Sequence, residues 1–249
     1  MRQTRRRAVL GIVPARGGSK GIPRKNIRPL AGKPLLEYTA NAALSATLLS
    51  RVWLSTEDLE IAEVGKAAGL EVPFFRPPEL SEDSTPMVDV VLHAIRWAQE
   101  NQQEYDAVCI LQPTSPLRSS MTIDRSISLL WDRHVDSVVS VRPVPLECNP
   151  HWVFFETSDG LLRPSLGDAP PITRRQQLPP AYHLDGTIFV TRTQSVVNHH
   201  SLTGGRLLGM ISAADESFDL DTQEQWQVLE ERLNSVQELT KPRGSGRHR

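Results

Sequence analysis

The stretch AVLGIVPARGGSKGIPRKN, residues 8–26, joins an apolar run to a loop rich in glycine and basic residues. The apolar run is short and continuous, which is typical of a strand buried in a parallel sheet. The loop that follows it holds Arg16, Lys20, Arg24 and Lys25. Loops at the carboxyl ends of strands bind ligands in open α/β sheets, and glycines let backbone N–H groups approach phosphate oxygens. The stretch therefore predicts an α/β fold whose first loop binds a polyphosphate.

The spacing of the glycines and the charge of the chain narrow what this loop could bind. The glycines match neither G-x-x-x-x-G-K-[ST] nor G-x-G-x-x-G, which disfavours a P-loop ATPase and a dinucleotide dehydrogenase. A solvated surface loop remains an alternative on chemistry alone. The chain holds 28 Lys and Arg against 29 Asp and Glu, so an anion site must arise from local placement. We therefore expect no nucleic-acid partner.

Short apolar runs alternate with helical patterns along the first part of the chain, which is the rhythm of βαβ units. We predict strands at 8–13, 51–55, 72–75, 107–111 and 137–141, and helices at 34–46, 58–68 and 86–100. The chain later returns to a strand at 206–212 and to a helix after DLDTQEQW, where Thr222 and Gln225 match the pattern of a capping box.

Proline-rich pieces interrupt this rhythm after residue 142. We interpret residues 142–190 as a β-rich insertion, because short β-like runs such as HWVFF and GTIFV lie between the prolines. Residues 1–7 and 238–249 are rich in basic residues and are predicted to be a basic tail and a disordered basic tail.

Composition predicts a soluble, cytoplasmic protein. Of the 249 residues, 39% are hydrophobic, which is enough for a core, and no apolar stretch approaches the length of a membrane span. The apolar segment near the start is too short for the h-region of a signal peptide. Cys109 and Cys148 lie far apart, which favours reduced thiols. No membrane partner is expected.

Four further motifs accompany the basic loop, namely LSTEDLEIA (54–62), FRPPELSED (75–83), LQPTSPLR (111–118) and SFDLDT (217–222). With the loop and in this order, they resemble the acylneuraminate cytidylyltransferase (CMP-sialic acid synthetase) family from about residue 9 to about residue 235. The resemblance implies a Rossmann-like nucleotidyltransferase domain over 8–237, a three-layer fold with a mainly parallel sheet. It also implies a protruding dimerisation and acceptor subdomain at 142–190, a homodimer, CTP as cosubstrate and Mg²⁺ (or Mn²⁺).

The resemblance assigns roles to residues of the nucleotide site. Arg16, Lys20, Lys25 and Asn26 would hold and polarise the phosphates, with Lys25 as the leading catalytic candidate beside Arg16 and Lys20. Within the same signature, Gly17, Gly18 and Ser19 would bind the nucleotide. Arg76 and Asp83 match positions near the cytidine, although Asp83 is also explained as a surface carboxylate ahead of a helix. Gln112 would meet ribose or sugar, and Thr114, Ser115 and Arg118 would shape the site.

SFDLDT is the candidate metal motif. Asp219 and Asp221 occupy alternate positions of an extended segment, so their carboxylates point the same way and suit Mg²⁺ shared with substrate phosphates. They match the family's D-x-D motif. The alternative is that one of them caps the helix that follows.

The acceptor side departs from the sialic-acid-activating members. Arg175 falls on a position able to pair with a sugar carboxylate. Two cationic contacts of those members are replaced near Trp152 and at His183, which retains a hydrogen-bonding side chain. The predicted reaction joins CMP from CTP to the anomeric hydroxyl of a nonulosonic sugar acid, an N-acylneuraminate or a related acid, and releases pyrophosphate. Legionaminic, pseudaminic or KDO activation, or a non-catalytic nucleotide-binding relative, are the alternatives.

Overall fold

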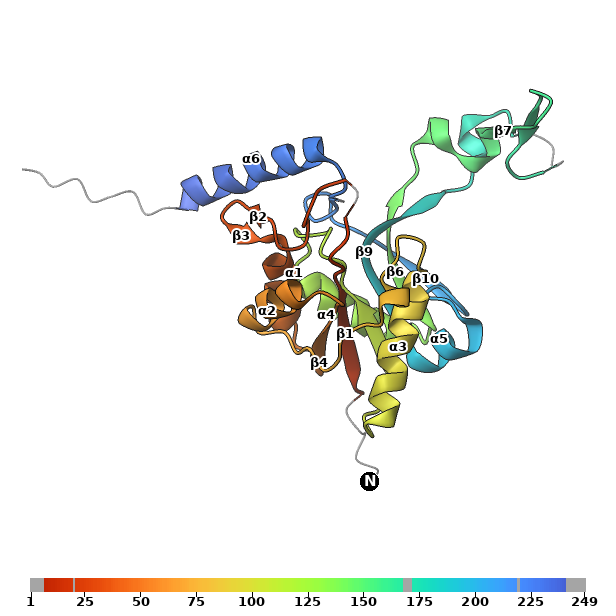
Figure 1. The fold of residues 1–249 in the computed structure, drawn as a ribbon. Coiled ribbons are helices and arrows are strands. Elements are labelled where there is room, and N and C mark those ends of the chain that lie inside the picture. Colours follow the sequence, from red (N-terminus) through yellow and green to blue (C-terminus); the bar gives the residue numbers. More distant parts are fainter. Residues whose placement is uncertain (1–6, 20, 168–171, 219, 241–249) are drawn as a thin grey trace, which may run out of the picture.

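The computed structural model describes residues 7–19, 21–167, 172–218 and 220–240, and its centre is a sheet with strand order β10-β6-β9-β5-β1-β4 (Figure 1). β1 (Val9–Pro14) pairs in parallel with β4 (Arg51–Ser55) and with β5 (Ala107–Ile110). β6 (Ser137–Pro143) pairs in parallel with β10 (Leu207–Ile211). β9 (Tyr182–Arg192) joins the two halves by antiparallel pairing with β5 and β6. The predicted mainly parallel α/β sheet is confirmed.

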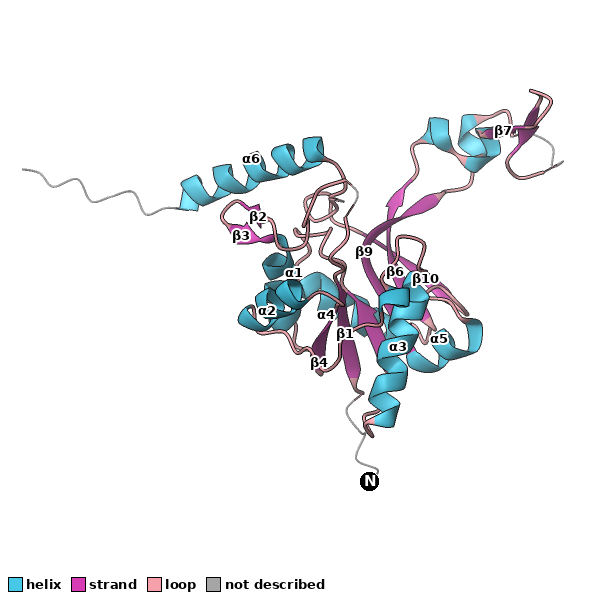
Figure 2. Cartoon of the chain, viewed as in Figure 1, coloured by secondary structure: helices cyan, strands magenta, loops and turns pink. Residues whose placement is uncertain are grey.

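Helices cover both faces of this sheet (Figure 2). Alternation along β1 assigns the faces, because Val9 and Val13 lie in one buried cluster and Leu10 and Ile12 in the other. The first cluster also contains side chains of α1 (Leu35–Leu44), α2 (Leu59–Ala67) and α4 (Ser120–Asp132). The second contains side chains of α3 (Met87–Glu100) and α5 (Thr193–His199). The result is the expected three-layer arrangement.

Some predicted elements differ from the observed ones. Residues 72–75 form no strand: Glu71 makes one parallel bridge to Trp53, and Pro73 then lacks the N–H that would extend the pairing. Val72 and Phe74 are apolar because they pack on the two sides of the sheet. The helices α4 and α5 were not predicted.

The last helix, α6 (Gln223–Thr240), packs on the loop that follows β1. Trp226 and Leu229 share a buried cluster with Ile22 and Leu30, the latter in the hairpin of β2 (Pro29–Leu30) and β3 (Lys33–Pro34). The predicted capping box is confirmed: Gln225 N donates to Thr222 Oγ1 at 3.3 Å, and Thr222 N donates to Gln225 Oε1 at 2.8 Å. Because α6 extends to Thr240, its last turn includes residues that were expected in the tail. Residues 1–6 and 241–249 lie outside the described part.

Residues 142–190 leave the sheet through β6 and return through β9, and we call the projecting part the arm (Figure 1). The arm contains β7 (Phe154–Glu156) paired with β8 (Leu162–Pro164), so the prediction of strands is correct in part. Short 3₁₀ helices at Leu146–Cys148, Pro150–Trp152 and Arg175–Gln177 make up much of the rest, because proline favours such turns over ladder pairing.

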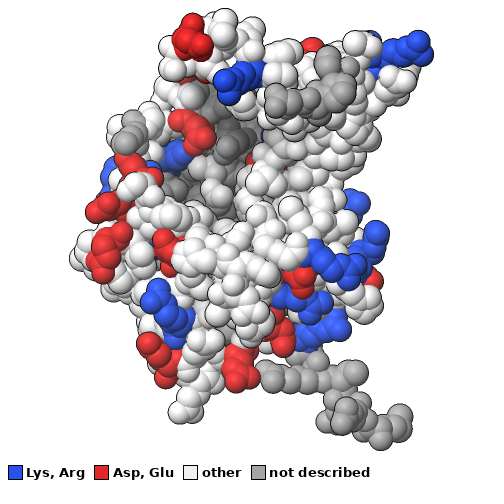
Figure 3. Space-filling view, turned by 90° about the vertical axis from the view of Figure 1, so that its right-hand side faces the viewer, with Lys and Arg blue, Asp and Glu red and all other residues white. Residues whose placement is uncertain are grey.

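Charged side chains of both signs are scattered over the face of the molecule that Figure 3 shows, among larger uncharged areas. In the described part of the chain, no helix combines the length and the apolar character needed to cross a membrane. Cys109 is buried, Cys148 is exposed, and both are free thiols. Burial raises the pKa of the Cys109 thiol to about 12, so it remains protonated at neutral pH.

Candidate active site

A cleft of about 270 Å³ opens where the carboxyl ends of β1 and β5 meet the start of α6. This is the edge at which open α/β sheets bind ligands. Its walls come from the basic loop and from three of the four further motifs, those at 75–83, 111–118 and 217–222. The predicted residues that line it are Arg16, Gly18, Ser19, Lys25, Asn26, Arg76, Asp83, Gln112, Thr114 and Asp221.

Glu57, in the remaining motif at 54–62, anchors the basic loop to the rest of the cleft. Its carboxylate accepts a hydrogen bond from Gly17 N at 2.7 Å and one from Arg76 Nη2 at 3.0 Å. Burial alone would raise the pKa of Glu57, but the Gly17 and Arg76 hydrogen bonds outweigh it and hold that pKa below its usual range. Arg76 is itself 4% exposed and is one of the residues that line the cleft. Glu57 was not predicted as a site residue, although its position just after β4 was a signal for one.

Asn26 also holds the loop, because its side-chain amide donates to Arg16 O at 2.9 Å. Arg24 faces away from the cleft, pairs with Asp58 and Glu60, and is stabilised in its charged form by them, so its pKa is raised. Arg24 therefore fixes the loop to residues 58–60, while Arg16 and Lys25 face the cleft.

Arg16 and Asp83 form an ion pair between the two loops that border the cleft. About a third of each side chain is exposed, 34% for Arg16 and 37% for Asp83. Both residues therefore remain accessible to a ligand. The pairing places Asp83 at the cleft beside the basic loop, and its role near the cytidine stays a prediction.

Lys25 connects the basic loop with the acidic motif. Its Nζ donates to Leu220 O at 2.8 Å and lies 2.9 Å from Asp221 Oδ1. The Lys25 side chain is only 13% exposed, whereas that of Asp221 is 62% exposed. Asp221 thus keeps coordination capacity toward the open cleft.

Gly21 lets the basic loop pass close to the acidic motif at 217–222. A Cβ at this position would lie 2.4 Å from the backbone oxygen of Asp221, a distance that no side chain tolerates. At Gly18, by contrast, a Cβ would meet nothing within 4 Å, so the backbone there borders open space. The glycines of the loop thus serve close chain packing at one point and ligand access at another.

The LQPTSPLR motif divides between the cleft and the core. Gln112 and Thr114 line the cleft, as predicted. Ser115 differs from the prediction, because its side chain is 1% exposed and it is absent from the cleft wall. Arg118 is buried as well, donating to Thr187 O, to Thr39 Oγ1 at 3.1 Å and to Gln112 O at 3.2 Å. Burial lowers the pKa of Arg118 to about 10, so it is still charged at neutral pH and fixes the Gln112 backbone.

The residues predicted to bind the acceptor lie away from the cleft within this chain. Arg175 and His183 are exposed on the arm and its root, and neither lines the cleft. Trp152 is tied to the arm through Nε1, which donates to Ile172 O at 2.6 Å. Lys20 and Asp219 lie outside the described residues. Other described residues line the cleft without having been predicted: Pro14, Leu80, Glu82, Thr85, Met87, Val90 and Pro113.

Metal-binding capacity in the cleft depends on the acidic motif. Within the described ranges, no group of three or more His, Cys, Asp or Glu side chains is arranged to hold a metal ion. Mg²⁺ is commonly held by one or two carboxylates together with substrate phosphates. The hard, accessible carboxylate of Asp221 beside the basic loop fits that mode of binding.

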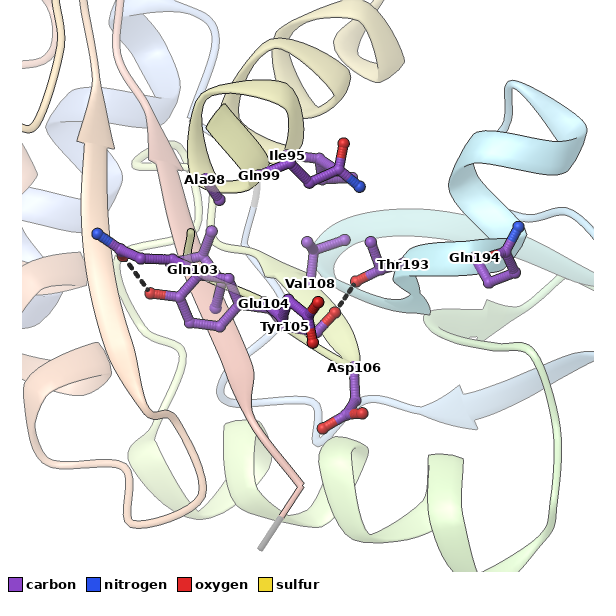
Figure 4. Close-up of a pocket in the computed structure, with 11 residues that line it drawn as sticks. Ile95, Ala98, Gln99, Gln103, Glu104, Tyr105, Asp106, Val108, Thr193 and Gln194 are labelled. Atoms are coloured by element: carbon purple, nitrogen blue, oxygen red, sulfur yellow. Dashed lines mark hydrogen bonds between the residues drawn. The ribbon is translucent and has the colours of Figure 1, made fainter. Parts of the chain in front are cut away.

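A second cavity, of about 310 Å³, lies at the opposite edge of the sheet (Figure 4). It is formed by the end of α3, the amino end of β5 and the start of α5. Gln103, Tyr105 and Thr193 are joined there by hydrogen bonds, and Glu104 and Asp106 supply its charge. Its described lining contains no lysine or arginine, so it is unsuited to a triphosphate.

Comparison with known proteins agrees with the geometry of the cleft. A cytidylyltransferase family model matches residues 10–148, more than half of the chain. CMP-N,N′-diacetyllegionaminic acid synthase from Legionella pneumophila is 34% identical over 92% of this chain and 98% of its own length. The chain belongs to the cytidylyltransferase family.

The predicted resemblance to acylneuraminate cytidylyltransferases is confirmed by further relatives of this cytidylyltransferase. N-acylneuraminate cytidylyltransferase from Streptococcus agalactiae serotype III is 33% identical over 86% of this chain, which spans about half of that relative's length. A solved CMP:2-keto-3-deoxy-manno-octonic acid synthetase in complex with CTP superposes with a TM-score of 0.66 over 92% of this chain and 99% of the other. At 16% identity, that likeness concerns the fold.

Proposed function

We propose that this cytidylyltransferase transfers CMP from CTP to the anomeric hydroxyl of a nonulosonic sugar acid. The observation that carries the proposal is the contact of Lys25 with Asp221, which brings the basic loop and the acidic motif to one cleft. A nucleotidyl transfer needs both halves, because cations must neutralise the triphosphate while carboxylates hold a divalent ion against it.

The triphosphate of CTP would bind along the basic loop. Arg16 and Lys25 face the cleft, Lys20 belongs to the same signature, and Gly18 leaves its backbone accessible. In the structure, Arg16 is paired with Asp83 and Lys25 with Asp221. Phosphate oxygens would replace these carboxylates as partners of the two cations.

We assign a divalent cation, Mg²⁺ or Mn²⁺, to Asp219 and Asp221. When bound, it would orient phosphate oxygens, offset their charge and acidify the attacking hydroxyl. Lys25 contacts the Asp221 carboxylate and would stabilise the α-phosphate of the bound nucleotide.

In the proposed reaction, the anomeric oxygen of the sugar acid forms a bond to the α-phosphorus of CTP. The bond from that phosphorus to the bridging oxygen breaks, pyrophosphate leaves with the electron pair, and the hydroxyl proton is released. Arg16 and Lys25 would stabilise the negative charge on the leaving pyrophosphate. Catalysis is thus mostly positioning and charge neutralisation.

We propose an N-acylneuraminate or a related nonulosonic acid as the acceptor. The Legionella relative favours testing a legionaminic-type acid first, since this chain spans 98% of its length. A carboxylate-bearing sugar needs a cationic partner, and Arg175 is our candidate. Cationic contacts of the sialic-acid-activating members are replaced at His183 and near Trp152, and these two side chains would adapt the pocket to the sugar substituents.

We also propose a homodimer in which the arm of one subunit completes the cleft of the other. This arrangement would bring Arg175 and His183 to an active site that they do not reach within one chain. The arm exposes apolar side chains that would be covered in such an interface, at 49% for Phe154, 64% for Phe155 and 67% for Leu162. With unpaired thiols and a cellular nucleotide as substrate, we place the reaction in the cytoplasm.

Pyrophosphate release tests this function directly. The purified protein is incubated with CTP, Mg²⁺ and a panel of N-acetylneuraminic, legionaminic, pseudaminic and KDO acids, with ATP, GTP and UTP as nucleotide controls. We expect release with CTP and at least one nonulosonic acid. Release with no nonulosonic acid would overturn the enzyme proposal, and activity with KDO alone would overturn the acceptor class.

A further inference from the structure

The root of the arm is hydrogen-bonded to the segment that carries the acidic motif. Arg142, on β6, donates through Nε to Ser217 Oγ and through Nη2 to Ser217 O at 2.7 Å. Ser217 Oγ in turn donates to Asp185 Oδ2, on β9, at 2.8 Å. The chain between β10 and α6 therefore passes the two strands from which the arm projects (Figure 1).

Asp185 is a rigid end point for this contact. Its side chain is fully buried, and the carboxylate accepts hydrogen bonds from Ser140 Oγ and from Thr187 N at 3.0 Å in addition to Ser217. A buried carboxylate is tolerated only with such partners, and together they leave it no alternative orientation. Ser217 is consequently fixed to the central sheet rather than to another loop.

The other end of the same segment is fixed in the cleft. Leu220 N donates to Thr114 O at 3.0 Å, and Leu220 O accepts from Lys25 Nζ at 2.8 Å. Ser217 and Leu220 are only three positions apart, so a shift of Ser217 acts on Leu220 over a short length of chain. Asp221 follows directly, and the direction of its carboxylate depends on both attachments.

We propose that Arg142 and Asp185 are positioning residues that act through Ser217 to hold the carboxylate of Asp221 in its working geometry. This inference rests on the proposed function, because it takes Asp221 to bind a divalent cation. Residues that orient a metal ligand without binding the metal themselves affect its affinity, so their loss weakens metal binding although every ligand is still present. This positioning also couples the root of the arm to the metal site.

The test separates positioning from a purely structural role. We compare Ser217→Ala and Asp185→Asn with two control variants near the amino end of β6. Ser137→Ala loses the hydrogen bond that Ser137 Oγ donates to Gly204 O at 3.0 Å. Asp136→Asn weakens the hydrogen bond that Asp136 Oδ2 accepts from Arg206 N at 2.8 Å. These controls remove the same chemical groups at the amino end of β6, away from the cleft.

We expect Ser217→Ala and Asp185→Asn to raise the Mg²⁺ concentration for half-maximal pyrophosphate release by about tenfold. Mn²⁺ affinity of the CTP complex, measured by the electron paramagnetic resonance signal of free Mn²⁺, should fall by a similar factor. CTP binding in EDTA, measured by calorimetry, should change less than about twofold. Ser217→Thr, which retains the hydroxyl, should recover most of the Mn²⁺ affinity, and both control variants should match the wild type.

Wild-type metal dependence in Ser217→Ala would overturn the inference, and so would an equal loss of CTP binding with and without metal. A variant that fails to fold is identified by thermal unfolding. If Ser217→Ala fails to fold, the metal affinity of Asp185→Asn against that of Asp136→Asn decides. If the wild type itself releases no pyrophosphate with any nonulosonic acid, the proposed function fails instead, and the two failures are distinguishable.

Discussion

Lys25 Nζ lies 2.9 Å from Asp221 Oδ1, although the two residues are separated by 196 positions in the chain. The contact forms because the loop after β1 and the start of α6 share a buried cluster that includes Ile22, Leu220 and Trp226. Arg28 reinforces it by donating to Gln223 Oε1 at 2.8 Å while its guanidinium lies 4.6 Å from the centre of the Trp226 ring. The two halves of the cleft are thus held together by contacts of the chain itself.

Removal of the Lys25 ammonium tests its role at the α-phosphate. Lys25→Ala is expected to lower kcat about 100-fold, the usual effect of deleting one donor to a developing charge, while the KM for CTP changes much less. Steady-state kinetics of pyrophosphate release provides both parameters. Lys33→Ala, which removes an exposed lysine 3.6 Å from Glu37, serves as the control and should keep wild-type kinetics. An effect confined to the KM would make Lys25 a binding residue only.

Asp221 is one of the two carboxylates of the proposed metal site, and the structure describes its side chain. Asp221→Ala is expected to abolish Mg²⁺-dependent turnover while the protein stays folded, because this carboxylate is 62% exposed and contributes little to the core. Activity across a Mg²⁺ and Mn²⁺ titration, together with the thermal unfolding midpoint, measures both effects. Asp215→Ala, which removes an exposed carboxylate from the preceding turn, should retain activity. Near-normal turnover of the Asp221 variant would exclude this residue from the metal site.

Local patterns in the sequence predict most of the helices and strands whose apolar residues repeat regularly, and they predict the basic loop after the first strand. Spacing and chain position predict the first strand and the capping box of Thr222 and Gln225. The family motifs point to Arg16, Lys25 and Gln112, which line the cleft. The helix α4 was missed although Ile123, Ile127 and Leu130 repeat at helical spacing after the N-cap Ser119, so its signal was present.

Other features depend on contacts distant in the chain. The apolar residues at 72–75 resemble a strand, but they are explained by packing on both sides of the sheet. Ser115 lies in the LQPTSPLR motif but is buried. Arg118, three residues later, points into the core and donates to Thr187 O on β9. The local sequence pattern does not show this long-range contact. Arg142 and Asp185 were not singled out, because their partner Ser217 lies 75 and 32 positions away, respectively.

Gly21 is predicted to be irreplaceable for geometric reasons. A Cβ there would lie 2.4 Å from Asp221 O, so Gly21→Ala must displace the acidic motif from the basic loop. A misplacement of about 1 Å can cost about 100-fold in rate, and we expect a fall in kcat of that order. Gly32→Ala is the control, since a Cβ there meets nothing within 4 Å and its positive φ of 85° affects stability alone. Equal kinetics of the two variants would contradict the prediction.

The Glu57 carboxylate is expected to make stability depend on pH. Hydrogen bonds from Gly17 and Arg76 outweigh the effect of burial and hold the pKa of Glu57 below its ordinary value of about 4.3. Since the folded protein has the lower pKa, its stabilising contribution is present above the unfolded value and is lost as the pH falls through the folded value. Glu57→Gln removes this contribution and should lower the free energy of unfolding at pH 7 by about 1–3 kcal/mol.

Denaturant unfolding of the wild type and Glu57→Gln between pH 7 and pH 3 measures this difference. We expect it to stay constant well above pH 4.3 and to shrink on acidification, because the protonated glutamate then resembles the glutamine. Glu63→Gln, which removes an exposed carboxylate 3.0 Å from Lys66, is the matched control on α2 and should shift stability by less than about 0.5 kcal/mol throughout. A difference between Glu57→Gln and the wild type that keeps its size down to pH 3 would show that Glu57 stabilises the loop by packing rather than by its charge.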